Sequence, residues 1–189
     1  MYFIYRILTN LLIIISPIIF FFRILKGKED KQRFLEKFGQ YSVNNHKHND
    51  VWIHATSLGE LMSVIPIIKK FEKNKKIKRV MLTTSTQSSA KIFSKLIFKK
   101  TFHIYFPLDT NYLTKKFLDY WQPQLAIFVD SEIWPNMFNN LNKKKIPIIL
   151  LNARITKKTF EKWQILCGFA RKIFGSISLA LPQNTKTSM

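Results

Sequence analysis

Short apolar blocks alternate with longer mixed stretches along most of this chain. Each short block holds about five residues that are apolar throughout, which is typical of strands covered on both faces. The mixed stretches between them have helical lengths. The pattern predicts six strands, at residues 51–54, 79–83, 102–106, 125–129, 146–151 and 176–181. It predicts helices at residues 59–74, 87–98, 111–121, 135–142 and 158–174.

Strands that alternate in this way with helices favour a parallel sheet covered by helices. We therefore expect an α/β domain with a Rossmann-like open parallel sheet over residues 51–182. Ligands of such sheets bind beyond the carboxyl ends of the strands. The segments to search for a site are 54–60, 83–89, 106–110, 129–136 and 151–156.

The amino-terminal residues form the longest apolar stretch. Residues 11–22 read LLIIISPIIFFF, and extension to residues 2–25 gives the length of about 20 residues that a membrane span needs. The longer window includes Arg6, Asn10 and Arg23, so the sequence leaves open whether the segment spans the bilayer or lies at its interface. No small-residue cleavage site follows, which favours a retained anchor over a cleaved signal peptide. We assign the anchor to residues 1–27.

Residues 28–50 connect this anchor to the domain. Residues 29–40 predict an amphipathic helix that ends at Gly39, and the polar remainder predicts a linker. His46 and His48 have no carboxylate or Cys cluster beside them, so we predict no metal site. Basic residues around the end of the anchor predict that the domain lies on the cytoplasmic side. These residues are Arg23, Lys26, Lys28, Lys31 and Arg33.

The composition adds a strong positive charge, with 31 Lys and Arg against 11 Asp and Glu and a net charge of +20. Either an anionic partner accounts for this charge, or an AT-rich genome enriches Lys together with Asn, Ile and Phe. No helix-turn-helix, zinc-ligand set or RNP-like strand is present, so we expect an anionic membrane surface rather than nucleic acid as a partner. Cys167 lies in an apolar stretch, which predicts a buried thiol.

Glu60 is the candidate for chemistry in the first of the five segments. Residues 54–60 form a turn from a strand into a helix, and Gly59 permits close approach of a ligand or another backbone. The helix dipole alone favours an acidic residue in a first turn. A carboxylate at a strand end is also placed to take a proton from a hydroxyl. The spacing alone does not decide between these two interpretations.

The other segments also carry polar side chains. Residues 83–89 form a hydroxyl-rich loop that opens a helix, which suits either an anionic ligand or simple helix capping. Asp130 and Glu132 precede Pro135, which starts a helix. Arg154 follows the fifth strand, where it can pair with a carboxylate or a phosphate. The absence of GxGxxG, Walker and GxSxG motifs argues against dinucleotide, P-loop and serine-nucleophile chemistry.

Four of these segments resemble, in the same order, motifs of the Kdo transferases (3-deoxy-D-manno-octulosonic acid transferases). Residues 52–60 resemble the W-I-H-A-x-S-x-G-E signature, and residues 106–109 resemble the P-x-D segment. Residues 130–136 are similar to E-T-E-x-W-P-N, and residues 151–155 are similar to N-A-R-[LI]. With the amino-terminal anchor, the resemblance covers nearly the whole chain.

The resemblance implies an inverting GT-B glycosyltransferase with two Rossmann-like domains and no metal or cofactor. It implies transfer of Kdo from CMP-Kdo to a lipid A precursor at the cytoplasmic face of the inner membrane. The amino-terminal domain of the family binds the lipid, and the carboxyl-terminal domain binds the CMP-sugar. Glu60 matches the proposed general base, and Asp130 matches an acidic position that is important for activity. The residues expected to bind the acceptor are Ser57, Gly59, Thr86, Ser88, Glu132, Asn136 and Arg154.

Three features depart from the family pattern. Asp130 stands where the family normally has Glu, and residues 86–89 read TQSS instead of T-P-T-G. Residues 183–189 correspond to the start of an interdomain linker, so we expect the donor half to be absent from this chain or supplied by a separately encoded partner. The alternative hypothesis is a truncated or split-gene product that holds the acceptor domain and has no activity of its own.

Overall fold

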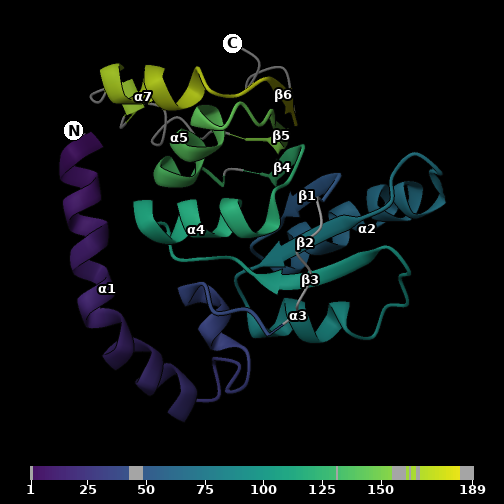
Figure 1. The fold of residues 1–189 in the computed structure, drawn as a ribbon, viewed down its shortest axis with the longest axis horizontal. Helices are drawn as coiled ribbons and strands as arrows, with labels where there is room; N and C mark the ends of the chain where they lie inside the picture. Colours follow the sequence, from purple (N-terminus) through teal and green to yellow (C-terminus); the bar gives the residue numbers. More distant parts are fainter. Residues whose placement is uncertain are drawn as a thin grey trace.

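Six parallel strands form one sheet in the order β3-β2-β1-β4-β5-β6 (Figure 1). The computed structural model describes residues 2–42, 49–130, 132–154, 161, 163–164 and 167–183. The strands are β1 (Val51–His54), β2 (Val80–Thr84), β3 (Thr101–Tyr105), β4 (Ala126–Val129), β5 (Ile148–Ala153) and β6 (Leu179–Pro182). This order confirms the predicted Rossmann-like open parallel sheet.

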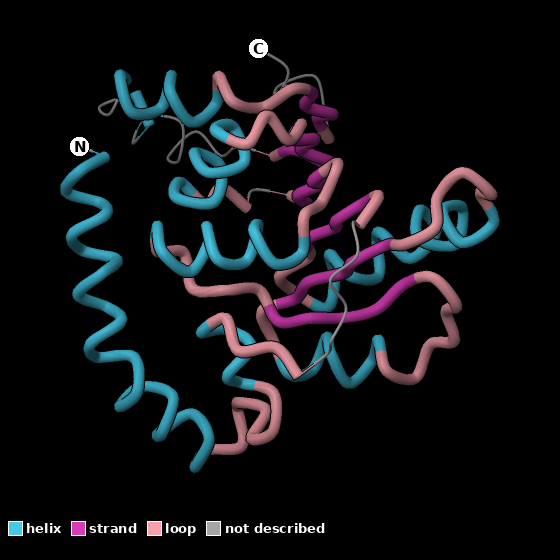
Figure 2. Tube along the Cα trace, viewed as in Figure 1, coloured by secondary structure: helices cyan, strands magenta, loops and turns pink. Residues whose placement is uncertain are grey.

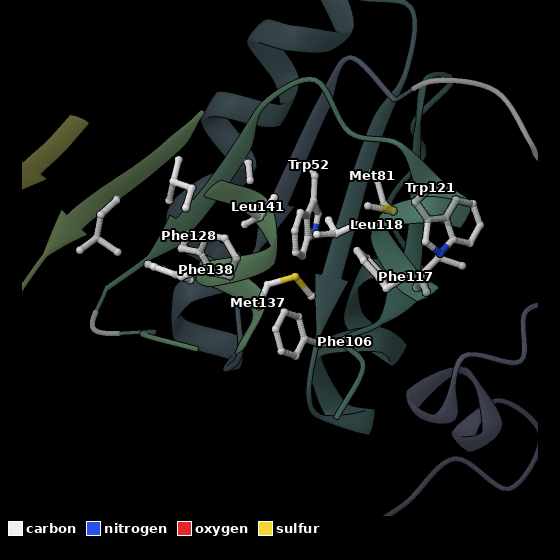
Figure 3. Close-up of a cluster of buried hydrophobic side chains, with 14 of the residues drawn as sticks. Trp52, Met81, Phe106, Phe117, Leu118, Trp121, Phe128, Met137, Phe138 and Leu141 are labelled. Carbon is white, nitrogen blue, oxygen red and sulfur yellow. The ribbon is translucent and has the colours of Figure 1, made fainter. Parts of the chain in front are cut away.

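Helices cover both faces of this sheet. The helical elements are α1 (Tyr2–Leu25), η1 (Phe34–Phe38), α2 (Leu58–Lys73), α3 (Gln87–Phe93), α4 (Asn111–Trp121), α5 (Pro135–Lys143) and α7 (Cys167–Phe174). Helices α4, α5 and α7 share one core cluster with the strands, and α2 and α3 share the other. In the first cluster Trp52 packs on Phe117, and Phe128 packs on Phe138 (Figure 3). Burial on both faces explains why β1, β2 and β4 are largely apolar, whereas the edge strand β6 is exposed.

Hydroxyl side chains fix where three helices begin. Ser57, Thr86 and Thr110 are the N-cap residues of α2, α3 and α4, and each side chain accepts a hydrogen bond from the backbone N–H three residues later. Such a cap satisfies one of the four backbone donors that a helix start leaves without a partner in the helix. Thr110, and not the preceding Asp109, is the N-cap of α4.

Asp109 instead caps a different helix. Its carboxylate accepts hydrogen bonds from the backbone N–H groups of Asn136 and Met137, at 3.1 and 2.8 Å, in the first turn of α5. The Tyr5 hydroxyl of α1 donates to the same carboxylate at 2.7 Å. Burial raises the pKa of Asp109, and these three donors oppose that effect. The loop after β3, the start of α5 and the anchor helix are thus joined at one side chain.

The predicted amphipathic helix over residues 29–40 is wrong in extent, because only the 3-10 turn η1 forms there. The physical reason is that charged side chains of this segment face the domain instead of solvent. Lys37 Nζ donates to Glu29 Oε1 at 2.6 Å and to the carbonyl oxygen of Ser85 at 3.1 Å. The Glu36 carboxylate accepts the backbone N–H of Tyr105 at 2.9 Å. The conformation of this segment is therefore set by its polar contacts with the sheet and not by a helical periodicity of apolar residues.

Three further predictions need correction or lie outside the described residues. Helix α3 ends at Phe93, five residues before the predicted end, and a turn continues the chain. Cys167 is exposed rather than buried. Helix α7 forms the last part of the helix predicted over residues 158–174, and residues 158–160 lie outside the described residues. His46 and His48 of the predicted linker also lie outside them.

Asp109→Ala is expected to destabilise the domain by about 2–4 kcal/mol, because two buried N–H groups of α5 lose their acceptor. The matched control is Asp119→Ala, since Asp119 is a half-exposed carboxylate paired with Lys144 at the surface. That change should cost less than about 1 kcal/mol. Urea unfolding in detergent, followed by tryptophan fluorescence, measures both. Equal midpoints for the two variants would contradict the capping role of Asp109.

Candidate functional site

The site lies where the sheet order reverses. Strands β1 and β4 are neighbours in the centre of the sheet, while the chain continues from β1 to β2 on one side and from β4 to β5 on the other. In open α/β sheets this switch point leaves a crevice beyond the carboxyl ends of the two strands. The segment after β1 carries Glu60, and the segment after β4 carries Asp130 and Glu132. Two segments that are distant in sequence therefore meet at one edge.

Glu60 is held in the first turn of α2 by hydrogen bonds from two groups. Thr56 N–H donates to Glu60 Oε2, and the Ser57 hydroxyl donates to Glu60 Oε1, both at 2.8 Å. The backbone N–H of Glu60 returns a bond to Ser57 Oγ at 3.3 Å. This is a capping-box arrangement, which satisfies donors at the helix start. The carboxylate thus has a structural role whatever its chemistry.

The same carboxylate can still accept a proton. An ionised carboxylate has about four lone-pair positions, so each oxygen of Glu60 keeps one after its bond to Thr56 or Ser57. The residue before it, Gly59, is exposed, and a Cβ placed there would meet no protein atom within 4 Å. No side chain at Gly59 therefore stands between the first turn of α2 and an approaching ligand.

His54 is a residue of this site that the sequence search did not select. Its ring is fully buried, stacks on Phe106 with centroids 3.9 Å apart, and contacts the Thr83 and Thr56 hydroxyl oxygens at 2.9 and 3.1 Å. Burial lowers the pKa of His54 to about 3, so the imidazole is neutral at physiological pH. His54 therefore positions Thr56, whose N–H holds Glu60. The sequence feature that could have identified His54 is its place as a polar residue at the end of an apolar strand.

Glu132 faces the other two carboxylates. Burial raises the pKa of Glu132, and the negative charges of Glu60 and Asp130 raise it further, against a hydrogen bond from Thr56. Glu132 Oε2 lies 4.0 Å from Nε2 of the neutral His54 ring. A like charge acts over short distances, so the shift indicates that the three carboxylates share one environment.

Asp130 turns the chain at the end of β4. Its φ angle is +60°, a left-handed conformation that Asp adopts more readily than most side chains. Its backbone N–H donates to the carbonyl of Leu151, and Arg154 lies 3.4 Å from its Oδ2 atom. Oδ1 is buried and has no hydrogen-bond partner in the described part of the chain. That oxygen is suited to accept a donor from a ligand.

The remaining predicted acceptor-binding residues divide by their surroundings. Thr86 caps α3 and contacts the Ser88 hydroxyl at 3.1 Å, on a loop that joins the loop of Thr56 through the Ser85 N–H. Asn136 is fully buried, and its amide group donates to the carbonyl of Asp109 and to Thr9 Oγ1. The structure therefore gives Asn136 a role in joining α5 to the anchor helix, and we leave it out of the proposed acceptor contacts.

The described residues contain no cluster of three or more His, Cys, Asp or Glu side chains with the geometry of a metal site. The polar groups at the switch point are instead carboxylates, hydroxyls, one guanidinium and a neutral imidazole. Such a set can abstract a proton and hold a polar or anionic substrate by hydrogen bonds.

Comparisons with known proteins agree with these motifs. Residues 32–189 match the family model described as 3-deoxy-D-manno-octulosonic-acid transferase (kdotransferase). The chain is 37% identical, over 96% of its length, to a 3-deoxy-D-manno-octulosonic acid transferase from Rickettsia bellii, of which it covers 43%. It is 32% identical, over 97% of its length, to a probable mitochondrial 3-deoxy-D-manno-octulosonic acid transferase from Arabidopsis thaliana, of which it covers 42%.

A more distant relative is the 3-deoxy-D-manno-octulosonic acid transferase of Haemophilus influenzae, at 27% identity over 93% of this chain and 42% of that protein. The chain thus spans less than half the length of each of these three relatives. The family model nevertheless covers most of the chain, including all four motifs and the carboxylates of the switch point. This chain belongs to the 3-deoxy-D-manno-octulosonic acid (Kdo) transferase family.

Proposed function

We propose that this chain forms the acceptor-binding half of a Kdo transferase of lipopolysaccharide synthesis and that Glu60 is its general base. The observation that carries the proposal is the meeting of Glu60, Asp130 and Glu132 at the switch point of the sheet. These three carboxylates belong to two of the four motifs that resemble the family. They also occupy the edge at which open parallel sheets bind their ligands.

The proposed reaction is a single displacement. A glucosamine hydroxyl of the lipid A precursor attacks the anomeric carbon of Kdo in CMP-Kdo and forms the new C–O bond. The bond between that carbon and the phosphate oxygen breaks, and CMP leaves with the bonding electrons. Glu60 takes the hydroxyl proton on a lone pair that its capping bonds leave free. Because the hydroxyl attacks the face of the anomeric carbon opposite the leaving CMP, the anomeric configuration is inverted.

Other residues of the switch point would shape the acceptor pocket. Arg154 balances the charge of Asp130, and its exposed side chain can extend to a phosphate of the acceptor. The buried Oδ1 of Asp130 and the carboxyl of Glu132 can accept or share protons of sugar hydroxyls. Gly59 leaves room for the acceptor, and Ser57, Thr86 and Ser88 supply hydroxyls on neighbouring loops.

The donor half and the membrane complete the proposal. A GT-B arrangement would place CMP-Kdo in a second Rossmann-like domain, either continuous with residues 183–189 or separately encoded. Helix α1 is long and apolar enough to attach the chain to a membrane, and the net charge of +20 attracts anionic lipid. We place the domain at the cytoplasmic face of an inner membrane. The competing hypothesis remains an acceptor domain that binds the lipid and has no activity by itself.

Glu60→Gln, made in the complete transferase, is expected to lower kcat by about 10²–10⁴-fold, because the general base is lost. Gln also forms capping boxes, so the variant should keep the stability of the wild type. Asp119→Asn is the matched control, because it removes the charge of a half-exposed carboxylate on α4 that pairs with Lys144 and should leave both transfer and stability near those of the wild type. Steady-state transfer assays and urea unfolding separate the two roles. Near-normal transfer by Glu60→Gln would refute the assignment.

Glu132→Gln is expected to change how stability depends on pH. Because the folded state raises the pKa of Glu132 above its ordinary value of 4.5, the wild type has its full relative stability below that pH. The wild type then loses stability relative to the variant as pH rises through the folded pKa. Thermal unfolding between pH 4 and 8 measures this, with Asp119→Asn as the control for loss of an exposed charge. If the difference in stability between the wild type and Glu132→Gln did not grow with pH, the three carboxylates would not share one environment.

The 189-residue chain alone is expected to transfer no Kdo, because the family resemblance assigns CMP-sugar binding to a second Rossmann-like domain. Incubation of the purified chain with CMP-Kdo and a lipid A precursor, with and without a separately produced donor half, measures this. Transfer only in the presence of the donor half supports the divided enzyme. Transfer by the chain alone would contradict the assignment of donor binding to a second domain.

A further inference from the structure

Helix α1 has an unusual distribution of polarity. Large apolar side chains that face away from the protein cover most of its surface, and they run along its whole length. Ile4 is 53% exposed near one end, Ile14 is 72% exposed near the middle, and Leu25 is 66% exposed at the other end. In a helix that packs on a water-soluble domain, the apolar stripe normally faces the domain. Here the outward face of α1 is the apolar one.

The side of α1 that faces the domain carries polar groups. We call it the inward stripe, and it consists of Tyr2, Tyr5, Thr9, Ser16 and Phe20. The Tyr2 hydroxyl donates to Asn136 Oδ1 at 3.2 Å, and the Tyr5 hydroxyl donates to Asp109 Oδ2 at 2.7 Å. Thr9 Oγ1 accepts the Asn136 amide at 3.3 Å. The spacing of these residues by three, four or seven positions places them on one helical face.

The backbone of α1 is also suited to an apolar medium. Pro17 has no N–H group, so it cannot make the helical hydrogen bond to the carbonyl oxygen of Ile13. The Ser16 hydroxyl donates to that oxygen at 2.7 Å. An unpaired carbonyl is costly in hydrocarbon, where no water can replace the missing donor.

Both ends of α1 are attached to the same folded body. At the amino-terminal end, Tyr2 and Tyr5 hold α5 and the Asp109 loop. At the carboxyl-terminal end, Phe20 packs edge-on against Phe38 of η1 with centroids 5.1 Å apart, and Arg23 pairs with Glu29 at 3.0 Å. Figure 2 shows α1 running along the flank of the domain between these contacts. The helix is therefore part of the domain's side rather than a projecting stalk.

This attachment conflicts with a span. A helix of 24 residues is about 36 Å long, which exceeds a hydrocarbon core of about 30 Å. If α1 crossed the bilayer, the flank of the domain beside it would have to enter the hydrocarbon, and α7 would lie near the far side. That flank includes Lys172, whose exposed ammonium lies 4.8 Å from the ring of Tyr2. Charged groups within the hydrocarbon are costly.

Basic residues flank α1 at both ends instead of one. Arg6 and Lys172 lie at the amino-terminal end, and Arg23, Lys26 and Lys28 lie at the other. Between α1 and η1, an apolar groove of about 410 Å³ extends the outward face onto the domain. It is lined by Pro17, Phe20, Phe21, Ile24, Phe34, Leu35, Phe38 and Gln40. An apolar strip with positive charge at both ends complements the surface of an anionic bilayer.

We propose that α1 lies in the plane of an anionic bilayer, with its outward face in the acyl region of one leaflet and its inward stripe holding the domain flat against the head groups. This inference rests on the membrane attachment included in the proposed function. Lys37 joins η1 to the loop after β2, so this geometry brings the carboxyl-terminal edge of the sheet close to the lipid surface. A membrane-resident acceptor would then reach the site by lateral diffusion.

Depth measurements on the full chain test the proposal. In a Cys167→Ser background, Ile4→Cys, Ile14→Cys and Leu25→Cys are labelled with a small fluorophore and bound to vesicles of anionic and zwitterionic phospholipid. Quenching by lipids with nitroxides at shallow or deep positions then reports the depth of each label. We expect equal depth for the three labels, and protection from quenching for a label at Thr9→Cys on the inward stripe.

The outcomes are distinct. A label at Ile14 that lies much deeper than those at Ile4 and Leu25 would show a span and overturn the in-plane geometry while leaving membrane attachment intact. Failure of the chain to cosediment with vesicles would overturn both this inference and the proposed membrane location. None of these measurements depends on sugar transfer. A failure of the proposed reaction can therefore be told apart from a failure of the in-plane geometry.

A second variant tests the inward stripe without risk to the core. Tyr5→Phe keeps the ring and removes the donor to Asp109, so the amino-terminal half of α1 should loosen from the domain. A spin label at Ile4 should then gain mobility, while a label at Leu25 keeps its spectrum. Tyr112→Phe is the control, because Tyr112 is 67% exposed on α4. Unchanged mobility at Ile4 in Tyr5→Phe would contradict the role of the stripe.

Discussion

The parallel pairing of β1 with β4 is the constraint on which the rest of this molecule depends. The pairing sets Trp52 beside Ala126, Ile53 beside Ile127 and His54 beside Phe128, so two strands whose paired residues are 74 positions apart end at the same level. Because the chain leaves them in opposite directions along the sheet, the loops that follow diverge and leave room between them. The carboxylates of both family motifs meet in that room. Their distance in sequence is therefore no obstacle to a shared chemical environment.

The polar groups around this crevice serve the fold and the site together. Glu60 completes the capping box of α2 and keeps lone pairs for a substrate, and the buried His54 holds the segment from which Glu60 receives a hydrogen bond. A neutral imidazole suits this task, since it forms hydrogen bonds without placing another charge beside three carboxylates. Rigid support of this kind keeps a proton acceptor in place without the cost of ordering it during the reaction.

The amino-terminal helix is integrated into the domain by hydrogen bonds, whereas a hydrophobic contact would be the usual solution. Tyr5, Asp109 and the start of α5 form one connected group, and Lys37 links the next segment to the loop after β2. Polar contacts on the inside leave the apolar side chains outside, which is the opposite of a soluble protein and appropriate to a protein that rests on lipid. In the proposed in-plane arrangement, the same contacts would couple the position of the membrane surface to the edge of the sheet where the candidate site lies.

The sequence by itself determined the α/β class, the strand positions to within three residues, the long apolar helix and the family, because apolar periodicity and short motifs are local properties. It also located the carboxylates at strand ends. Only the tertiary structure decided which partner each polar group has. Asp109 caps α5 rather than α4, Asn136 is buried, and residues 29–40 form no amphipathic helix, since Arg33 and Glu36 bind backbone groups of the distant strand β3. Hydrogen-bond partners from other parts of the chain leave no periodic signal, so sequence patterns alone could not assign them.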